Sequence, residues 1–241
     1  MERLVISDGT DTATLSPTGE HWVLTIDVPP GQPERGQRLM EAAAQAVGRD
    51  GGGRIEYWVD GIDDGSDRVP MAAGFAPFRD LWKLGRSLPA IDGELQTRPF
   101  RSDDADAFLD VNNRAFDWHP EQGGMTPDGL ASRRSEPWYN DDGFRVWEDD
   151  AGNLGGFCWT KVHNDLEPPV GEIYAIAVDP EHRGRGLGRQ LTLAGLEWLA
   201  AQGLRRVILY VESDNRHANR IYRELGFECE ATNRAYQRIL R

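Results

Sequence analysis

The fold is decided by the stretch from Glu172 to Gly188, which has the sequence EIYAIAVDPEHRGRGLG. Its largely apolar first part, residues 172–178, predicts a strand, and three closely spaced glycines follow. Beyond them, apolar residues recur at helical spacing, at Leu187, Leu191, Ala194 and Trp198. A strand that passes through such glycines into a helix leaves backbone N–H groups pointing outward at the positive end of the helix. This arrangement favours the binding of a phosphate group.

By itself the glycine-rich loop is a weak signal, because a plain tight turn has the same composition. It matches neither G-x-x-x-x-G-K-[ST] nor G-x-G-x-x-G, the two better-known phosphate-binding patterns. Three arginines lie beside it, namely Arg183, Arg185 and Arg189. The whole chain has a net charge of −13, but salt screens charges beyond about 8 Å. The local arginines therefore favour an anionic ligand.

The composition excludes several classes of partner. The chain has 241 residues, 39% of them hydrophobic and 28% charged, as in a soluble globular protein of one large domain or two small ones. The net charge of −13 argues against nucleic acid or an anionic membrane surface as a partner. We expect a cytoplasmic protein, because nothing resembles a signal peptide or a membrane span and only Cys158 and Cys229 are cysteines. The five scattered histidines predict no metal site.

A domain boundary is predicted near residues 88–94, between a turn-rich first part and a more regular second part. The elements predicted beyond the boundary are a strand at 97–101, a helix starting at 102–104, a short helix from Pro127, a hairpin of 144–148 and 154–163, the strand and helix described above, a strand at 207–211 covered on both faces, a helix capped by 213–215 and ended by Gly226, and a strand at 236–240. This order predicts an α/β fold with a mixed sheet.

The first part of the chain looks like an incomplete copy of the second. It contains a predicted strand at 22–28, a helix at 34–47 and a strand at 54–60, and Gly74-Phe75 echoes Gly226-Phe227. We interpret this as an internal repeat. The residues before Trp22 are too few for the two helices that open the second copy. We therefore predict a truncated, degenerate copy in residues 1–92 and a complete one in residues 95–241.

The second copy resembles the GNAT superfamily of N-acetyltransferases. The superfamily's acetyl-CoA pyrophosphate signature, Q/R-x-x-G-x-G/A, is met by Arg183, Gly186 and Gly188. The order of strands, loop, capped helix and Gly-Phe is similar over residues 95–241. The resemblance implies a tandem GNAT-like acetyltransferase fold with acetyl-CoA as the acetyl donor.

Four further motifs, at residues 112–116, 119–124, 159–163 and 209–215, resemble the mycothiol synthase family, a tandem of two GNAT copies whose carboxy-terminal half is active. This resemblance implies acetyl transfer to the cysteinyl amine of Cys-GlcN-Ins. The first half departs from the family, because residues 29–36 stand where its glycine loop would be and the signature is missing. We therefore expect one CoA per chain.

Two residues are candidates for the chemistry. An α-amino group, with a pKa of about 7.7–8.0, needs only a carboxylate acting through one water to lose its proton. Glu172 stands where the family places that carboxylate, although a solvated glutamate at a strand end is the alternative. Tyr222 follows Asn215 by two helical turns on the same face and is our candidate proton donor to the leaving thiolate. An ordinary core tyrosine would occupy the same position.

The resemblance also implies two sets of binding residues. The predicted CoA site comprises Ile176, Ala177, Val178, Arg183, Gly184, Arg185, Gly186, Leu187, Gly188, Arg189, Asn215, Ala218, Asn219 and Arg220. The predicted acceptor site comprises Glu121, Lys161, Glu172 and Tyr210. Simpler roles compete at several positions: a buried strand for 176–178, a helix cap for Asn215, exposed side chains for Glu121 and Lys161, and core packing for Tyr210.

Two other functions fit the same residues. One is a GNAT enzyme that acetylates a peptide amino terminus or an aminoglycoside-like amine, since the fold and the CoA loop are common to all of these. The other is a regulatory module that binds acyl-CoA without catalysis; a sensor would need neither Glu172 nor Tyr222. The first half fits a structural or dimerising role, so the chain is expected to be a monomer or a homodimer.

Overall fold

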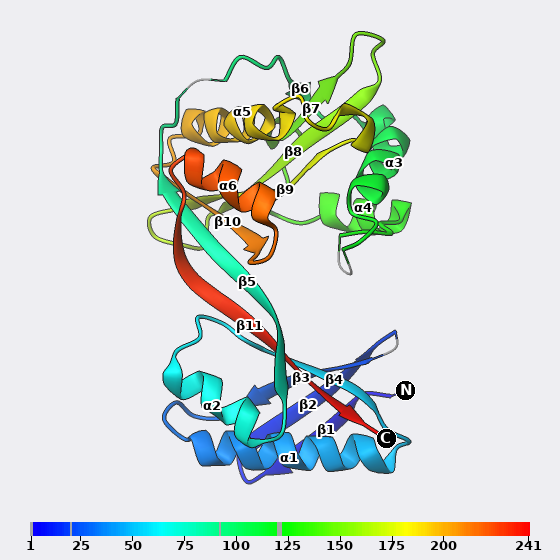
Figure 1. The fold of residues 1–241 in the computed structure, drawn as a ribbon, viewed down its shortest axis with the longest axis vertical. Helices are drawn as coiled ribbons and strands as arrows, with labels where there is room; N and C mark the ends of the chain where they lie inside the picture. The colour runs from blue at the N-terminus through cyan, green and yellow to red at the C-terminus, as the bar shows by residue number, and fades with distance from the viewer. Residues whose placement is uncertain (1, 20, 92, 120–121) are drawn as a thin grey trace. The chain divides into compact units, whose positions relative to one another are not determined.

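The computed structural model describes residues 2–19, 21–91, 93–119 and 122–241, and the chain divides into two compact units (Figure 1). Unit 1 consists of Met1–Lys83, Glu212–Asn215 and Cys229–Arg241. Unit 2 consists of Leu84–Val211 and Arg216–Glu228. These units are defined by contacts, whereas the division into two copies at residues 1–92 and 95–241 stays a prediction about the repeat.

Unit 2 contains a mixed sheet with helices on both faces (Figure 1). Its elements are β6 (Arg98–Pro99), α3 (Ala105–Ala115), α4 (Pro127–Arg134), β7 (Phe144–Glu148), β8 (Leu154–His163), β9 (Val170–Val178), α5 (Leu187–Ala201), β10 (Arg206–Glu212) and α6 (Arg216–Glu224). The strand order is β10-β9-β8-β7-β6, in which β9 and β10 are parallel and the other pairs antiparallel.

The alternation of side chains along β8 explains the two layers of unit 2. Phe157 and Trp159 point to one face, where they pack with Phe108 of α3 and Phe144 of β7 in a core that is closed to solvent. Helix α5 covers the opposite face. It approaches the sheet so closely that a Cβ added to its Gly195 would lie 2.5 Å from the Cys158 sulfur. Glycine is required there for close approach. Both faces of the sheet are therefore covered, and the loops lie at the ends of its strands.

The first seven strands and α-helices of the chain have the same order as the last seven. They are β1 (Leu4–Asp8), β2 (Asp11–Thr18), β3 (His21–Asp27), α1 (Pro33–Arg49), β4 (Gly53–Val59), α2 (Asp64–Ala72) and β5 (Ala76–Ser87), of which residues 84–87 belong to unit 2. These correspond in type and order to β7, β8, β9, α5, β10, α6 and β11 (Glu228–Leu240). In both units three antiparallel strands precede a helix, and the next strand is parallel to the third. The predicted internal repeat is confirmed at this level.

The sheet of unit 1 is completed by the last strand of the chain. Its order is β1-β2-β3-β4-β11, and β11 runs antiparallel to β4 from Arg234↔Val59 to Leu240↔Gly53. Tyr236 of β11 is fully buried in the same core as Trp22 and the inner face of α1. The guanidinium of Arg234 donates hydrogen bonds to the carboxylates of both Asp80 and Asp67 within this unit. Residues from the end of the sequence therefore stabilise the first unit.

Most of the predicted elements of unit 2 are confirmed, including the β7–β8 hairpin with the bounds expected. The expectation that residues 207–211 are covered on both faces is wrong at Tyr210, which is 41% exposed. The hairpin β1–β2, helix α2 and the full length of β11 were not predicted. Among the described residues, no helix is both long and apolar enough to cross a bilayer.

Candidate active site

The site begins where β9 separates from its parallel neighbour β10. The two strands pair at Val207↔Gly171, Ile208↔Glu172 and Leu209↔Ile173, and no further pair is formed although both strands continue. At this point β9 carries one extra residue, Tyr174, because Trp159 of β8 pairs with Ala175 while the next residue pairs with Ile173. Such a β-bulge bends the strand. The edge of β9 beyond Ile173 thus leaves backbone groups without a partner on β10.

The glycine-rich loop after β9 presents bare backbone. Gly184 and Gly186 have φ values of +80° and +75°, and no atom lies within 4 Å of a Cβ added at either. Gly186 is the N-cap of α5, so no side chain caps the first N–H groups of this helix. The first turn contains no acidic residue, although acids are favoured at that end of a helix. The start of α5 is therefore suited to binding an anion.

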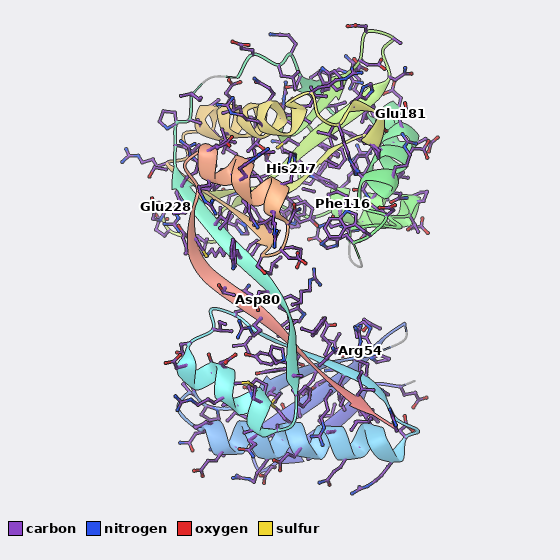
Figure 2. The ribbon with its side chains drawn as sticks, in the orientation of Figure 1. Arg54, Asp80, Phe116, Glu181, His217 and Glu228 are labelled. Atoms are coloured by element: carbon purple, nitrogen blue, oxygen red, sulfur yellow. The ribbon has the colours of Figure 1, made fainter. Side chains whose placement is uncertain are left out.

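Contacts from α3 hold the loop in place. The carboxylate of Asp179, which is 3% exposed, accepts a hydrogen bond from the Glu181 N–H at 2.9 Å and another from Arg114 of α3. Burial alone would raise the pKa of Asp179, but these hydrogen bonds outweigh it and hold the pKa below its ordinary value. The Arg183 guanidinium donates to the Ala115 carbonyl oxygen at 3.4 Å. Figure 2 shows Glu181 next to α3, where these contacts anchor the loop.

Glu172 is the carboxylate nearest the separation of the strands. It is 7% exposed and lies between Lys161 of β8 and Ile208 of β10 in the sheet. Its Oε2 is 2.6 Å from the Nε2 of His163. The Lys161 ammonium lies 5.1 Å from the centre of the Trp138 ring. A solvated glutamate at a strand end does not describe this residue, because its carboxylate is mostly buried and paired.

Tyr222 lies on α6, which packs beside the start of α5; a Cβ added to Gly188 would be 3.7 Å from Ile221. The Tyr222 ring is 7% exposed and contacts Phe227 edge to face, with 5.7 Å between the ring centres. Burial raises the pKa of its hydroxyl above the ordinary value, and the nearby Cys158 adds to the shift. Among the described residues the hydroxyl has no hydrogen-bond partner.

The remaining predicted residues fall in different environments. Asn219 is buried on α6, whereas Arg220 is exposed and within 3.9 Å of Glu224. Tyr210, at 41% exposed, is not explained by core packing. Asn215 is in the turn before α6 and belongs to unit 1 by its contacts. Glu121 lies outside the described residues.

Sequence reasoning missed His163, which is paired with Glu172, and Trp138, whose ring lies under the Lys161 ammonium. His163 ends the motif at residues 159–163 and shares a strand face with Lys161, which is the signal that would have identified it. Trp138 lies in the segment after α4, whose sequence has no helical or strand period. Within the described ranges, no group of three or more potential metal-binding side chains is formed.

If the backbone of the glycine-rich loop binds a phosphate of the ligand, Gly186→Ala should raise the KM for acetyl-CoA about tenfold. The substitution adds a methyl group where the ligand approaches the backbone. Gly203, at the other end of α5, is a matched control, since it also has a positive φ (+80°) and open space around it. Both variants cost about 1–2 kcal/mol of backbone strain. Thermal unfolding should therefore shift similarly in both, while KM rises only in Gly186→Ala. An unchanged KM in that variant would remove the loop from acetyl-CoA binding.

Comparison with known proteins agrees with this geometry. The model of the Acetyltransferase (GNAT) family matches residues 107–227. A GCN5-related N-acetyltransferase structure from Sphaerobacter thermophilus has a TM-score of 0.77 at 19% identity, covering 96% of this chain and 77% of that one. A tandem GNAT protein from the clavulanic acid biosynthesis pathway has a TM-score of 0.69 at 19% identity, covering 98% and 81%. The fold is thus a tandem GNAT fold.

Closer relatives share sequence over most of the chain. The mycothiol acetyltransferase of Nocardia farcinica is 42% identical over 84% of this chain and 70% of its own length. That of Mycobacteroides abscessus is 38% identical over 98% and 84%, and that of Actinosynnema mirum is 42% identical over 78% and 63%. The chain therefore belongs to the GNAT family of acetyl-CoA-dependent N-acetyltransferases, within the group of mycothiol acetyltransferase homologues.

Proposed function

We propose that this chain transfers the acetyl group of acetyl-CoA to the cysteinyl amine of Cys-GlcN-Ins, giving mycothiol, and that residues 95–241 form the catalytic part. The relatives named mycothiol acetyltransferase support the choice of acceptor. One structural observation carries the proposal. A buried carboxylate, Glu172, stands next to the residue at which β9 and β10 stop pairing, and an uncapped glycine loop follows the same strand.

The reaction needs a deprotonated amine. An α-amino group has a pKa of about 7.7–8.0, so deprotonation at neutral pH costs only about 1.4 kcal/mol. Glu172 takes the proton, directly or through one water, as the nitrogen attacks the thioester carbonyl carbon. The C–N bond forms, the C–S bond breaks and the thiolate of CoA leaves. Free N–H groups on the β9 edge beyond Ile173 supply hydrogen bonds to the thioester oxygen as its charge develops.

Each binding set has a distinct role in this proposal. Backbone groups of residues 176–178 hold the pantetheine arm, and the loop from Arg183 to Arg189 holds the pyrophosphate. Residues of α6, including Asn219 and Arg220, form the other wall of the CoA site. The acceptor is bound by Glu121, Lys161, Glu172 and Tyr210; the position of Glu172 and Tyr210 next to the last β9–β10 pair, Leu209↔Ile173, supports this role. Two free cysteines, Cys158 and Cys229, fit a cytoplasmic location.

The acceptor is tested by measuring the release of CoA thiol from acetyl-CoA by the purified protein with three amines: Cys-GlcN-Ins, a peptide and an aminoglycoside. We expect Cys-GlcN-Ins to give the highest kcat/KM by at least about a hundredfold, equivalent to about 2.7 kcal/mol of differential binding. Faster release with either of the other amines would assign a different acceptor. No release with any of them would favour an acyl-CoA-binding module.

We predict one CoA per chain. Unit 1 has the same order of elements as unit 2, but Pro29-Pro30-Gly31 precedes its helix α1, which begins with a proline at its first position. Proline has no N–H to offer a phosphate, and Glu34 in the first turn competes with an anion for the helix start. Isothermal titration with CoA should give a stoichiometry near one. A value near two would show that unit 1 also binds.

A further inference from the structure

The partner of Glu172 is a histidine on the neighbouring strand. His163 is the last residue of β8, and the strand register places Lys161, not His163, directly opposite Glu172. The imidazole nevertheless reaches diagonally across the pair and brings its Nε2 to 2.6 Å from Oε2 of Glu172. The side chains are 20% and 9% exposed. A short hydrogen bond between two largely covered groups fixes both rotamers.

Lys161, the residue directly opposite, does not pair with the carboxylate. Its ammonium lies over the Trp138 ring, 5.1 Å from the centre, and no ion pair joins it to Glu172 in the described part of the chain. This matters chemically, because a permanent cation beside a carboxylate makes it a weaker base. An imidazole can donate the same hydrogen bond while it is neutral.

The hydrogen bond leaves the two oxygens of Glu172 in different states. Oε2 is occupied by His163, whereas Oε1 has no partner among the described residues. A carboxylate held by one oxygen has less freedom to turn, which restricts the directions that its other oxygen can face. Without that hydrogen bond the side chain would turn about its own bonds and lose the alignment on which proton transfer depends.

We infer that His163 is a positioning residue, which holds Oε2 of Glu172 so that Oε1 accepts the proton of the acceptor amine or of the water between them. The inference rests on the proposed function, since it assumes that Glu172 is the base. It assigns a role to a residue on β8 that touches neither CoA nor the reacting atoms.

The test compares His163→Gln with His163→Asn. The Gln amide places an N–H donor where Nε2 of the histidine lies, whereas the shorter Asn does not reach Glu172. We expect His163→Asn to lower kcat about 10- to 100-fold with an unchanged KM for acetyl-CoA, and His163→Gln to recover most of the loss. If His163 had a purely structural role, these two similar polar variants would have similar kcat values. Thermal unfolding of both variants verifies that they are folded.

A matched control is His21→Asn in unit 1. His21 also approaches a buried glutamate, with its Nε2 3.7 Å from Oε2 of Glu56 and side-chain exposures of 25% and 11%. Its kcat should equal that of the parent protein.

A double-mutant cycle with Glu172→Gln separates the two possible failures. If His163 acts through Glu172, adding His163→Asn to Glu172→Gln changes kcat by less than about twofold. Two outcomes would overturn the inference and leave the base assignment intact. In the first, the kcat losses of the two single variants multiply in the double variant. In the second, the kcat of His163→Asn lies within twofold of the parent. An unaltered kcat in Glu172→Gln alone would overturn both.

Discussion

Glu172→Gln is expected to lower kcat by about 10²- to 10⁴-fold and to leave the KM for acetyl-CoA unchanged. The amide has the shape of the carboxylate and keeps an oxygen as acceptor, but it cannot take the proton of the amine. The predicted CoA contacts are made by later residues of β9 and by the loop, so the affinity for the donor does not depend on this charge. Steady-state kinetics with both substrates varied will separate the two effects.

Glu56→Gln is a suitable control for this substitution. Glu56 is 8% exposed, accepts a hydrogen bond from the Trp58 indole at 2.8 Å, and lies in unit 1. Both variants remove a buried carboxylate, so a general loss of stability would appear in both. Turnover should fall only in Glu172→Gln, and full turnover in that variant would exclude Glu172 as the base.

Tyr222→Phe should lower kcat by a similar factor, about 10²- to 10⁴-fold, with little change in the affinity for CoA. The phenyl ring keeps the packing against Phe227 and loses only the hydroxyl. A thiol has a pKa of about 8.5, so the leaving thiolate gains from a neutral hydrogen-bond donor. Because burial raises the pKa of Tyr222 above its ordinary value of 10.0, the hydroxyl remains protonated through the neutral range and above it.

The sign of this shift gives a second readout. A tyrosine whose pKa is raised loses its proton only at higher pH, so the kcat profile should show no decline due to Tyr222 below about pH 10. Tyr236→Phe serves as the comparison, because its hydroxyl bonds Asp67 in unit 1; its loss should lower the unfolding temperature without changing kcat. Retention of full kcat by Tyr222→Phe would leave Tyr222 as an ordinary core residue.

The elements of unit 2 were predictable because local patterns specify them. Apolar residues at helical spacing define α5, and the turn at residues 149–153 fixes the β7–β8 hairpin through the side chain of Asp149, which accepts from the N–H groups of Ala151 and Asn153. The β1–β2 hairpin was missed because its strands carry serine, threonine and aspartate; Ala13 and Leu15 are their only buried apolar residues, and the third buried residue is Asp11.

The features that make the site depend on pairing between strands, which the sequence does not display. The extra residue Tyr174, which bends β9, follows from the register between β8 and β9. The approach of His163 to Glu172 depends on the same register, so the sequence alone does not show that these two residues meet. The pairing of β11 with β4 joins residues about 180 positions apart, and it reflects long-range packing around Tyr236. The sequence thus identified candidate residues, and the fold determines which of them meet.

The central claim is that backbone N–H groups of residues 184–188 bind the pyrophosphate of acetyl-CoA while the freed edge of β9 holds its pantetheine. A crystal structure of the protein with acetyl-CoA bound tests it most directly. The account predicts the pyrophosphate oxygens within hydrogen-bond distance of those N–H groups and the thioester beside the residues that follow Glu172. Acetyl-CoA bound elsewhere on the chain, with this loop unoccupied, would contradict it.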